Sequence, residues 1–203
     1  MVNVERHGIS PEIFSGKIYI PDLNVTKGSP YLFENGFRKG IIYMGQMGFE
    51  DVLINIDITR QLLIIETGEK SSYSKIIIPH QKVDSFFVDG TKFIWSDKIE
   101  NGRGYLKRVS TGKLSLYIIT KNRRVIDQQQ QSFKYTKKQN GWYLQKDDAI
   151  KKVNSRKKMI KFLSEQNMDV QKSYVKKHVI LWRWYENSAK IELVRYLNSM
   201  DHK

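Results

Sequence analysis

Ser85-Phe-Phe-Val-Asp-Gly-Thr-Lys-Phe-Ile-Trp95 carries the clearest fold information in the chain. Its two halves, 85–88 and 91–95, are rich in β-branched and aromatic residues, which are typical of strands. Only Asp89-Gly90 separates them, and glycine readily adopts the positive φ that a two-residue hairpin turn requires. The stretch therefore predicts an antiparallel β-hairpin.

Short strand-like runs separated by turn residues continue on both sides of this hairpin, from residue 16 to residue 153. Through the hairpin, the predicted strands are 17–20, 40–44, 51–57, 61–66, 75–78, 82–88 and 91–95. Beyond it, Thr111-Gly112 separates strands 104–110 and 113–120, and Gln139-Asn140-Gly141 separates strands 133–137 and 142–145. Both spacings predict further hairpins. Strands in series without intervening helices favour an antiparallel meander, as a sandwich or an open barrel-like sheet.

The periodicity changes from strand-like to helical at Asn154-Ser155, either of which can cap a helix. The residues that then share one helix face are Met159, Ile160, Phe162 and Leu163. Further helices are predicted from near Asp169 and after Asn187-Ser188, the last with Ile191, Val194 and Leu197 buried. The predicted fold is α+β: a β-rich region, 1–153, and a basic helical tail, 154–203, docked on it as one structural unit.

The net charge of +14 is unevenly distributed along the chain. Residues 1–99 hold 11 Lys and Arg against 12 Asp and Glu, whereas residues 100–203 hold 24 against 9. The net charge of +15 in the second half favours anionic partners such as nucleic acid, anionic lipid or acidic polysaccharide. The alternative is a basic surface that only keeps the protein soluble.

The sequence lacks the residues or motifs that several kinds of chemistry require. The absence of Cys removes disulfides, thiolate metal sites and cysteine nucleophiles. The four histidines, His7, His80, His178 and His202, are scattered, with no spacing that suggests a metal. No nucleophile elbow or nucleotide-binding loop occurs, and no apolar run reaches the roughly 18 residues that cross a bilayer. We therefore expect no cofactor, no metal, no transmembrane segment and no catalytic residue.

Paired carboxylates occur at Glu50-Asp51 and at Asp147-Asp148. A glycan-acting hydrolase needs two acids that converge at about 5–10 Å. Neighbours on a strand point to opposite faces, so turn or edge positions are the favoured interpretation of both pairs. Acids brought together from distant strands remain an alternative.

Two groups of residues are candidate binding surfaces. Trp182, Arg183, Trp184 and Tyr185 combine aromatic faces with a cation and could stack bases or sugar rings. Alternatively, Trp182 and Tyr185 anchor the helical tail. The second group could contact a polyanion or form an ordinary solvated helix start, and it comprises Lys151, Lys152, Arg156, Lys157, Lys158 and Lys161.

Four segments together carry a family resemblance: 27–32 (Lys-Gly-Ser-Pro-Tyr-Leu), 112–116 (Gly-Lys-Leu-Ser-Leu), 141–163 from Gly-Trp-Tyr-Leu into the Lys-rich helix, and 193–199 (Leu-Val-Arg-Tyr-Leu-Asn-Ser). The chain resembles a family of uncharacterised exported proteins of Bacteroidetes. Family members usually carry a signal peptide and have no assigned activity. Residues 1–7 do not form an apolar leader, so the chain departs from the family pattern there.

The resemblance implies a location in the periplasm or at the cell surface. With no catalytic constellation in the sequence, the expected function is a non-catalytic cell-envelope binding or scaffold module. Its expected partner is an envelope protein or an anionic polymer. The alternatives are the hydrolase described above and a polyanion-binding or nucleic-acid-binding protein that uses the basic half, although no motif that reads bases is present.

Overall fold

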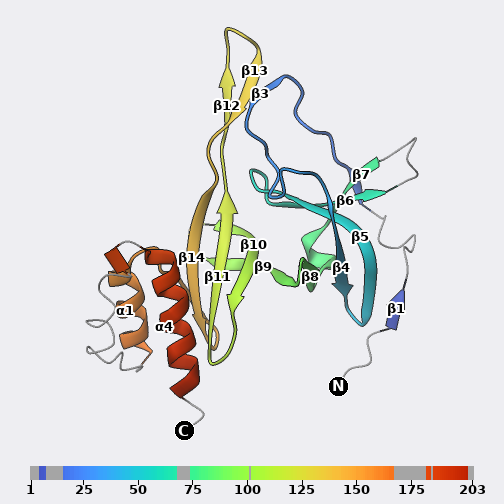
Figure 1. Ribbon diagram of the computed structural model, residues 1–203. Helices are drawn as coiled ribbons and strands as arrows, with labels where there is room; N and C mark the ends of the chain where they lie inside the picture. Colours follow the sequence, from blue (N-terminus) through green and yellow to red (C-terminus); the bar gives the residue numbers. More distant parts are fainter. Residues whose placement is uncertain are drawn as a thin grey trace. The chain divides into compact units, whose positions relative to one another are not determined.

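The computed structural model describes residues 5–7 (backbone), 16–67, 74–100, 102–166, 182–183 and 185–200 (Figure 1). The chain forms two compact units. The first comprises Met1–Ser96 with Thr120–Gln139, and the second comprises Asp97–Ile119 with Asn140–Lys203. The boundary predicted at 153/154 falls inside the second unit.

The first unit is built almost entirely from strands. They are β1 (Glu5–His7), β2 (Lys17–Ile18), β3 (Val25–Lys27), β4 (Arg38–Met44), β5 (Met47–Asp57), β6 (Leu62–Thr67), β7 (Ser74–Ile78), β8 (Ser85–Val88), β12 (Arg124–Asp127), β13 (Ser132–Tyr135) and most of β9 (Thr91–Ile99). A 3-10 turn, η2 (His80–Lys82), precedes β8.

The main sheet of the first unit has the order β9-β8-β4-β5-β6-β7-β2 and is antiparallel, with β1 pairing in parallel with β5. A smaller sheet has the order β12-β13-β3, in which β3 runs parallel to β13. The predicted hairpin at 85–95 is confirmed: Phe86 pairs with Phe93, their rings stack at 4.9 Å, and Asp89 and Gly90 have φ values of 49° and 69°. The fully buried core side chains include Ile42, Phe49, Ile54, Leu63, Ile65 and Phe86.

In its described residues, the second unit combines a sheet with the helices α1 and α4. Its strands are β10 (Gly102–Ser110), most of β11 (Leu114–Lys121), most of β14 (Gln139–Lys146) and β15 (Ala149–Lys152), in the order β15-β14-β11-β10. Its helices are α1 (Arg156–Glu165) and α4 (Glu186–Met200), drawn in orange and red in Figure 1. Apolar residues of both helices share one buried cluster with Leu114, Leu116, Trp142 and Leu144 of the sheet. The helices and the sheet of the second unit therefore share one apolar core.

The helix starts follow from local sequence. The Ser155 hydroxyl accepts a hydrogen bond from the backbone N of Lys158, so Ser155, one of the two predicted candidates, is the N-cap of α1. Met159, Phe162 and Leu163 are buried. In α4, Val194 and Leu197 are buried as expected, whereas Ile191 is only half-buried. The helix predicted near Asp169 lies outside the described residues.

One predicted hairpin is wrong. Strands 133–137 and 142–145 do not pair: β13 lies between β12 and β3, and β14 lies between β15 and β11. Asn140-Gly141, the predicted turn, is part of β14. The physical reason is burial, because Trp142 and Leu144 enter the core of the second unit while Tyr135 is buried in the first.

The protein is thus α+β, mostly antiparallel sheet, and the sheets are open, with strand orders that end in edge strands. Within the described part of the chain, neither helix is long and apolar enough to cross a membrane.

Candidate functional site

A buried carboxylate organises the turn between β5 and β6. Asp57 is fully buried, and its Oδ1 accepts hydrogen bonds from the backbone N of Thr59 and of Arg60, both at 2.9 Å. Its Oδ2 accepts from the Tyr19 hydroxyl at 3.0 Å and from Arg60 Nε at 2.6 Å. Four donors, one of them cationic, compensate the loss of water around this charge.

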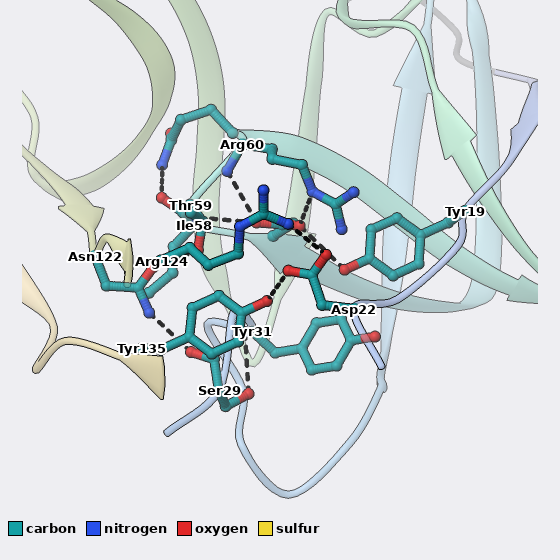
Figure 2. Close-up of polar contacts among 12 residues, drawn as sticks. Tyr19, Asp22, Ser29, Tyr31, Ile58, Thr59, Arg60, Asn122, Arg124 and Tyr135 are labelled. Atoms are coloured by element: carbon teal, nitrogen blue, oxygen red, sulfur yellow. Dashed lines mark hydrogen bonds and ion pairs between the residues drawn. The ribbon is translucent and has the colours of Figure 1, made fainter. Parts of the chain in front are cut away.

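A second carboxylate has the same kinds of partner. Asp22 accepts from Arg124 Nη1 at 2.8 Å and from the Tyr135 hydroxyl. Figure 2 shows these side chains beside Arg60 and Tyr19. Burial, reinforced by the adjacent carboxylates, raises the pKa of both Tyr19 and Tyr135 above the ordinary tyrosine value. Both phenols therefore remain protonated donors.

Asn122 links this cluster to the start of β12. Its Nδ2 donates to the backbone O of Ser29 at 2.8 Å, and its Oδ1 accepts from the Thr59 hydroxyl at 2.5 Å (Figure 2). Gln61 adds a bond to the backbone O of Thr120 at 3.0 Å. We call Asp57 and Asp22, together with the side chains bonded to them and with Asn122, the anchor cluster. A guanidinium and a phenol hold each of its two carboxylates, so the cluster acts as an anchor. It fixes the base of the β12–β13 ribbon against the β5–β6 turn.

The ribbon so anchored presents an exposed edge strand. In the described sheet β12 pairs only with β13, and we call residues 123–127 the β12 edge. Val125 and Ile126 point to opposite faces, yet they are 50% and 58% exposed. The neighbouring segment 18–25 also carries exposed apolar side chains, namely Ile18, Ile20, Leu23 and Val25.

The second unit carries most of the positive charge: 19 Lys and Arg against nine Asp and Glu, compared with 16 against 12 in the first unit. β15 and α1 bring together the six predicted polyanion-binding residues, called here the basic strip: Lys151, Lys152, Arg156, Lys157, Lys158 and Lys161. Four of them are exposed, and Lys152 and Arg156 are half-buried.

Glu165 is the acidic neighbour of the basic strip. It lies 2.8 Å from Lys151 Nζ and 3.8 Å from Lys161 Nζ. The hydrogen bond from Lys151 holds the pKa of the Glu165 carboxyl below its ordinary value. Among the described residues, the other four cations of the strip have no carboxylate partner.

The predicted aromatic surface is only partly described. Trp182 is 7% exposed and belongs to the apolar cluster of the second unit, whereas Tyr185 is 64% exposed and Arg183 is exposed. Trp184 lies outside the described residues. The position of Trp182 agrees with an anchoring role, and a ligand-binding role for the group stays a prediction.

The two acidic pairs lie in different units. Asp51, in β5, is exposed and lies 3.0 Å from Lys39 Nζ. Asp147 and Asp148 form the turn between β14 and β15, where Asp147 has a φ of 51°. Of the histidines, His80 stacks on Trp95 at 4.0 Å, while His178 and His202 lie outside the described residues. Among the side chains that the structure describes, no three potential ligands gather into a metal site.

The sequence prediction missed the anchor cluster and β12. Asp57 had a local signal, because aspartate is typical of an Asx turn. In such a turn its side chain accepts hydrogen bonds from the backbone N–H groups two or three residues later. Asp22 and Arg124 had none, because 102 positions separate them.

No protein-family model matches the chain, and no curated protein or solved structure shows significant similarity to it.

Proposed function

We propose that the protein is a non-catalytic binding module that holds an anionic polymer of the cell envelope on the basic strip of its second unit. The observation that carries this proposal is the concentration of unpaired charge. Lys152, Arg156, Lys157 and Lys158 lie within seven residues and have no carboxylate partner in the described part of the chain. The envelope location follows the family resemblance.

Folding alone gives no reason for this arrangement. Lys157 and Lys161 are four residues apart on α1, where like charges destabilise a helix by about 0.2–0.5 kcal/mol per pair. A bound polyanion would attract both lysines and so outweigh the repulsion between them. It would also release its own condensed counterions, which drives association without any shaped pocket.

The expected ligand is recognised by its charge spacing and not by its sequence. Nucleic acid shares this chemistry, but the described helices and strands present no base-reading motif. Binding should therefore be indifferent to base sequence and strongly dependent on salt.

Heparin chromatography of the full chain tests the proposal. The variant Lys152→Gln, Arg156→Gln, Lys157→Gln, Lys158→Gln should elute at clearly lower salt than the parent. With duplex DNA as the probe, four lost contacts should flatten the slope of log K against log salt by about 4, at about 0.9 per phosphate.

A matched variant controls for net charge. Replacing Lys17, Lys27, Lys82 and Lys137 of the first unit by Gln removes the same four charges from exposed positions. It should leave retention close to that of the parent. If both variants lose retention equally, or if neither does, the basic strip is not the binding surface. Fractionation of the source cell tests the location separately, and recovery in the cytoplasm would count against the envelope.

A further inference from the structure

β12 is a short edge strand of the described sheet, with charged residues at its ends and an apolar centre. Edge strands are normally protected by shortness, charged side chains, proline or a covering element, because their free backbone groups can pair with another chain. The charges at this edge would oppose pairing with a like-charged strand but are complementary to a second copy in one register. In β12 the two central residues, Val125 and Ile126, are apolar and exposed on opposite faces. The anchor cluster holds the strand in place at its base through Arg124 and Asn122. The edge is therefore already ordered for pairing.

The sequence of this edge is self-complementary in one antiparallel register. A twofold axis perpendicular to a sheet places one residue opposite its own copy, so the position on the axis determines every other pair. With Val125 on the axis, Arg123 faces Asp127 of the second copy, and Arg124 faces Ile126 of that copy. With Arg124 on the axis, two guanidiniums would face each other. With Ile126 on the axis, Asp127 would face Val125 and Arg123 would face Gln129, so no Arg–Asp ion pair would form.

The side-chain directions fit the Val125 register. Residues 123, 125 and 127 share one face, so a central Val125 pair would be flanked by two Arg123–Asp127 ion pairs. Among the described residues, the Arg123 guanidinium has no carboxylate partner. Hydrogen bonds from the backbone of Gln130 and from Lys134 lower the pKa of Asp127, so its carboxylate is charged at neutral pH. On the other face, Ile126 would lie beside the aliphatic stem of Arg124.

We infer that the β12 edge is a self-association surface, on which two copies of this chain pair their β12 strands antiparallel about a twofold axis at Val125. The occupant is a second copy because, in this register, Arg123 and Asp127 of the two copies are complementary in charge and the two Val125 side chains meet between them. The interface is small, so the dimer belongs to the weak, concentration-dependent class. The inference is independent of the proposed polyanion function.

The absence of cysteine allows a direct test of the register. In Val125→Cys the two thiols would lie directly opposite each other, at a Cα separation of about 4.5–5.5 Å that a disulfide can span. In Ile126→Cys they would be offset by two positions along the strands, beyond that span. Under mild oxidation of the full chain, Val125→Cys should give a disulfide-linked dimer much faster than Ile126→Cys. It should also be faster than Ile20→Cys, an exposed control outside the edge.

A charge exchange tests the same interface without oxidation. By sedimentation velocity over a range of concentrations, the parent should self-associate, and Arg123→Glu and Asp127→Arg should each weaken association. The double variant should restore it, because the pairs re-form with their signs exchanged. A parent that stays monomeric, equal cross-linking of all three cysteine variants, or a double variant as weak as the single ones would overturn the inference.

Discussion

The side-chain amide of Asn198 pairs with both backbone groups of Leu114. Leu114 N donates to Asn198 Oδ1 at 2.9 Å, and Asn198 Nδ2 donates to the backbone O of Leu114 at 2.9 Å. A further bond of 3.3 Å reaches the backbone O of Thr111. A Cβ at Gly112 would lie 2.6 Å from this amide, so the turn approaches as closely as glycine allows. The amide thus attaches α4 to the β10–β11 hairpin.

Replacing Asn198 by Ala should destabilise the protein by about 2 kcal/mol, because partly buried backbone groups of the hairpin lose their partners. Urea denaturation measures the change in unfolding free energy. Asn187→Ala makes the same substitution at an exposed position of α4 and should stay within about 0.5 kcal/mol of the parent. Equal effects of the two would show that the amide pairing is unimportant.

Lys190 is a buried lysine, and two substitutions separate the contribution of its aliphatic stem from that of its ammonium group. Its side chain is 2% exposed, and its Nζ lies 3.0 Å from Glu186 and 3.3 Å from the backbone O of Asn154. Lys190→Ala should cost about 3 kcal/mol through lost packing and lost bonds. Lys190→Met should cost less than half of that, since it keeps the stem and Glu186 is 44% exposed and stays hydrated. A methionine variant as unstable as the alanine variant would assign the stability to the ammonium.

Trp182 should be an anchor of the second unit. Its ring is buried in the cluster shared by the helices and the sheet, so Trp182→Ala should cost about 3–5 kcal/mol. Tyr185→Ala removes an aromatic ring that is 64% exposed and should be nearly neutral. Thermal denaturation compares the two. A Trp182 variant that melts within about 2 °C of the parent contradicts the anchoring role.

The Asp57 carboxylate should matter far more than an exposed one. Asp57→Asn keeps the shape but removes the charge that faces Arg60 and two acceptor sites, so we expect a loss of about 3 kcal/mol. Asp51→Asn breaks the exposed pair with Lys39 and should cost less than about 1 kcal/mol. Denaturant titration of both variants measures the difference, and similar values would show that the Asp57 cluster is not an anchor.

Local elements were predictable because their signals are local. The hairpin at 85–95 follows from turn residues between strand-forming runs, and α1 follows from a capping residue at Asn154-Ser155 and from its apolar spacing. The basic strip was also predictable, since its charges are adjacent in the sequence. β12 was missed because Arg124-Val-Ile-Asp127 is only four residues long and lies beside the glutamine-rich turn.

The wrong hairpin shows where local signals fail. Gln139-Asn140-Gly141 has turn chemistry, yet it lies within β14 because burial of Trp142 and Leu144 outweighs turn preference. The anchor cluster was equally out of reach, since Asp22 meets Arg124 and Tyr135 only after the two segments have folded together.

The sequence by itself determined the secondary-structure class, the β8–β9 hairpin, the start of α1 and the basic second half. Each depends on backbone preference, side-chain period or charge, which act between neighbours in the chain. Only the tertiary structure decided that β13 pairs with β3, that Asp22 meets Arg124, that Asn198 holds Leu114 and that β12 has a free edge among the described strands. Such pairings join segments about 84–107 positions apart. They form because burial of apolar surface selects them and buried polar groups then require partners.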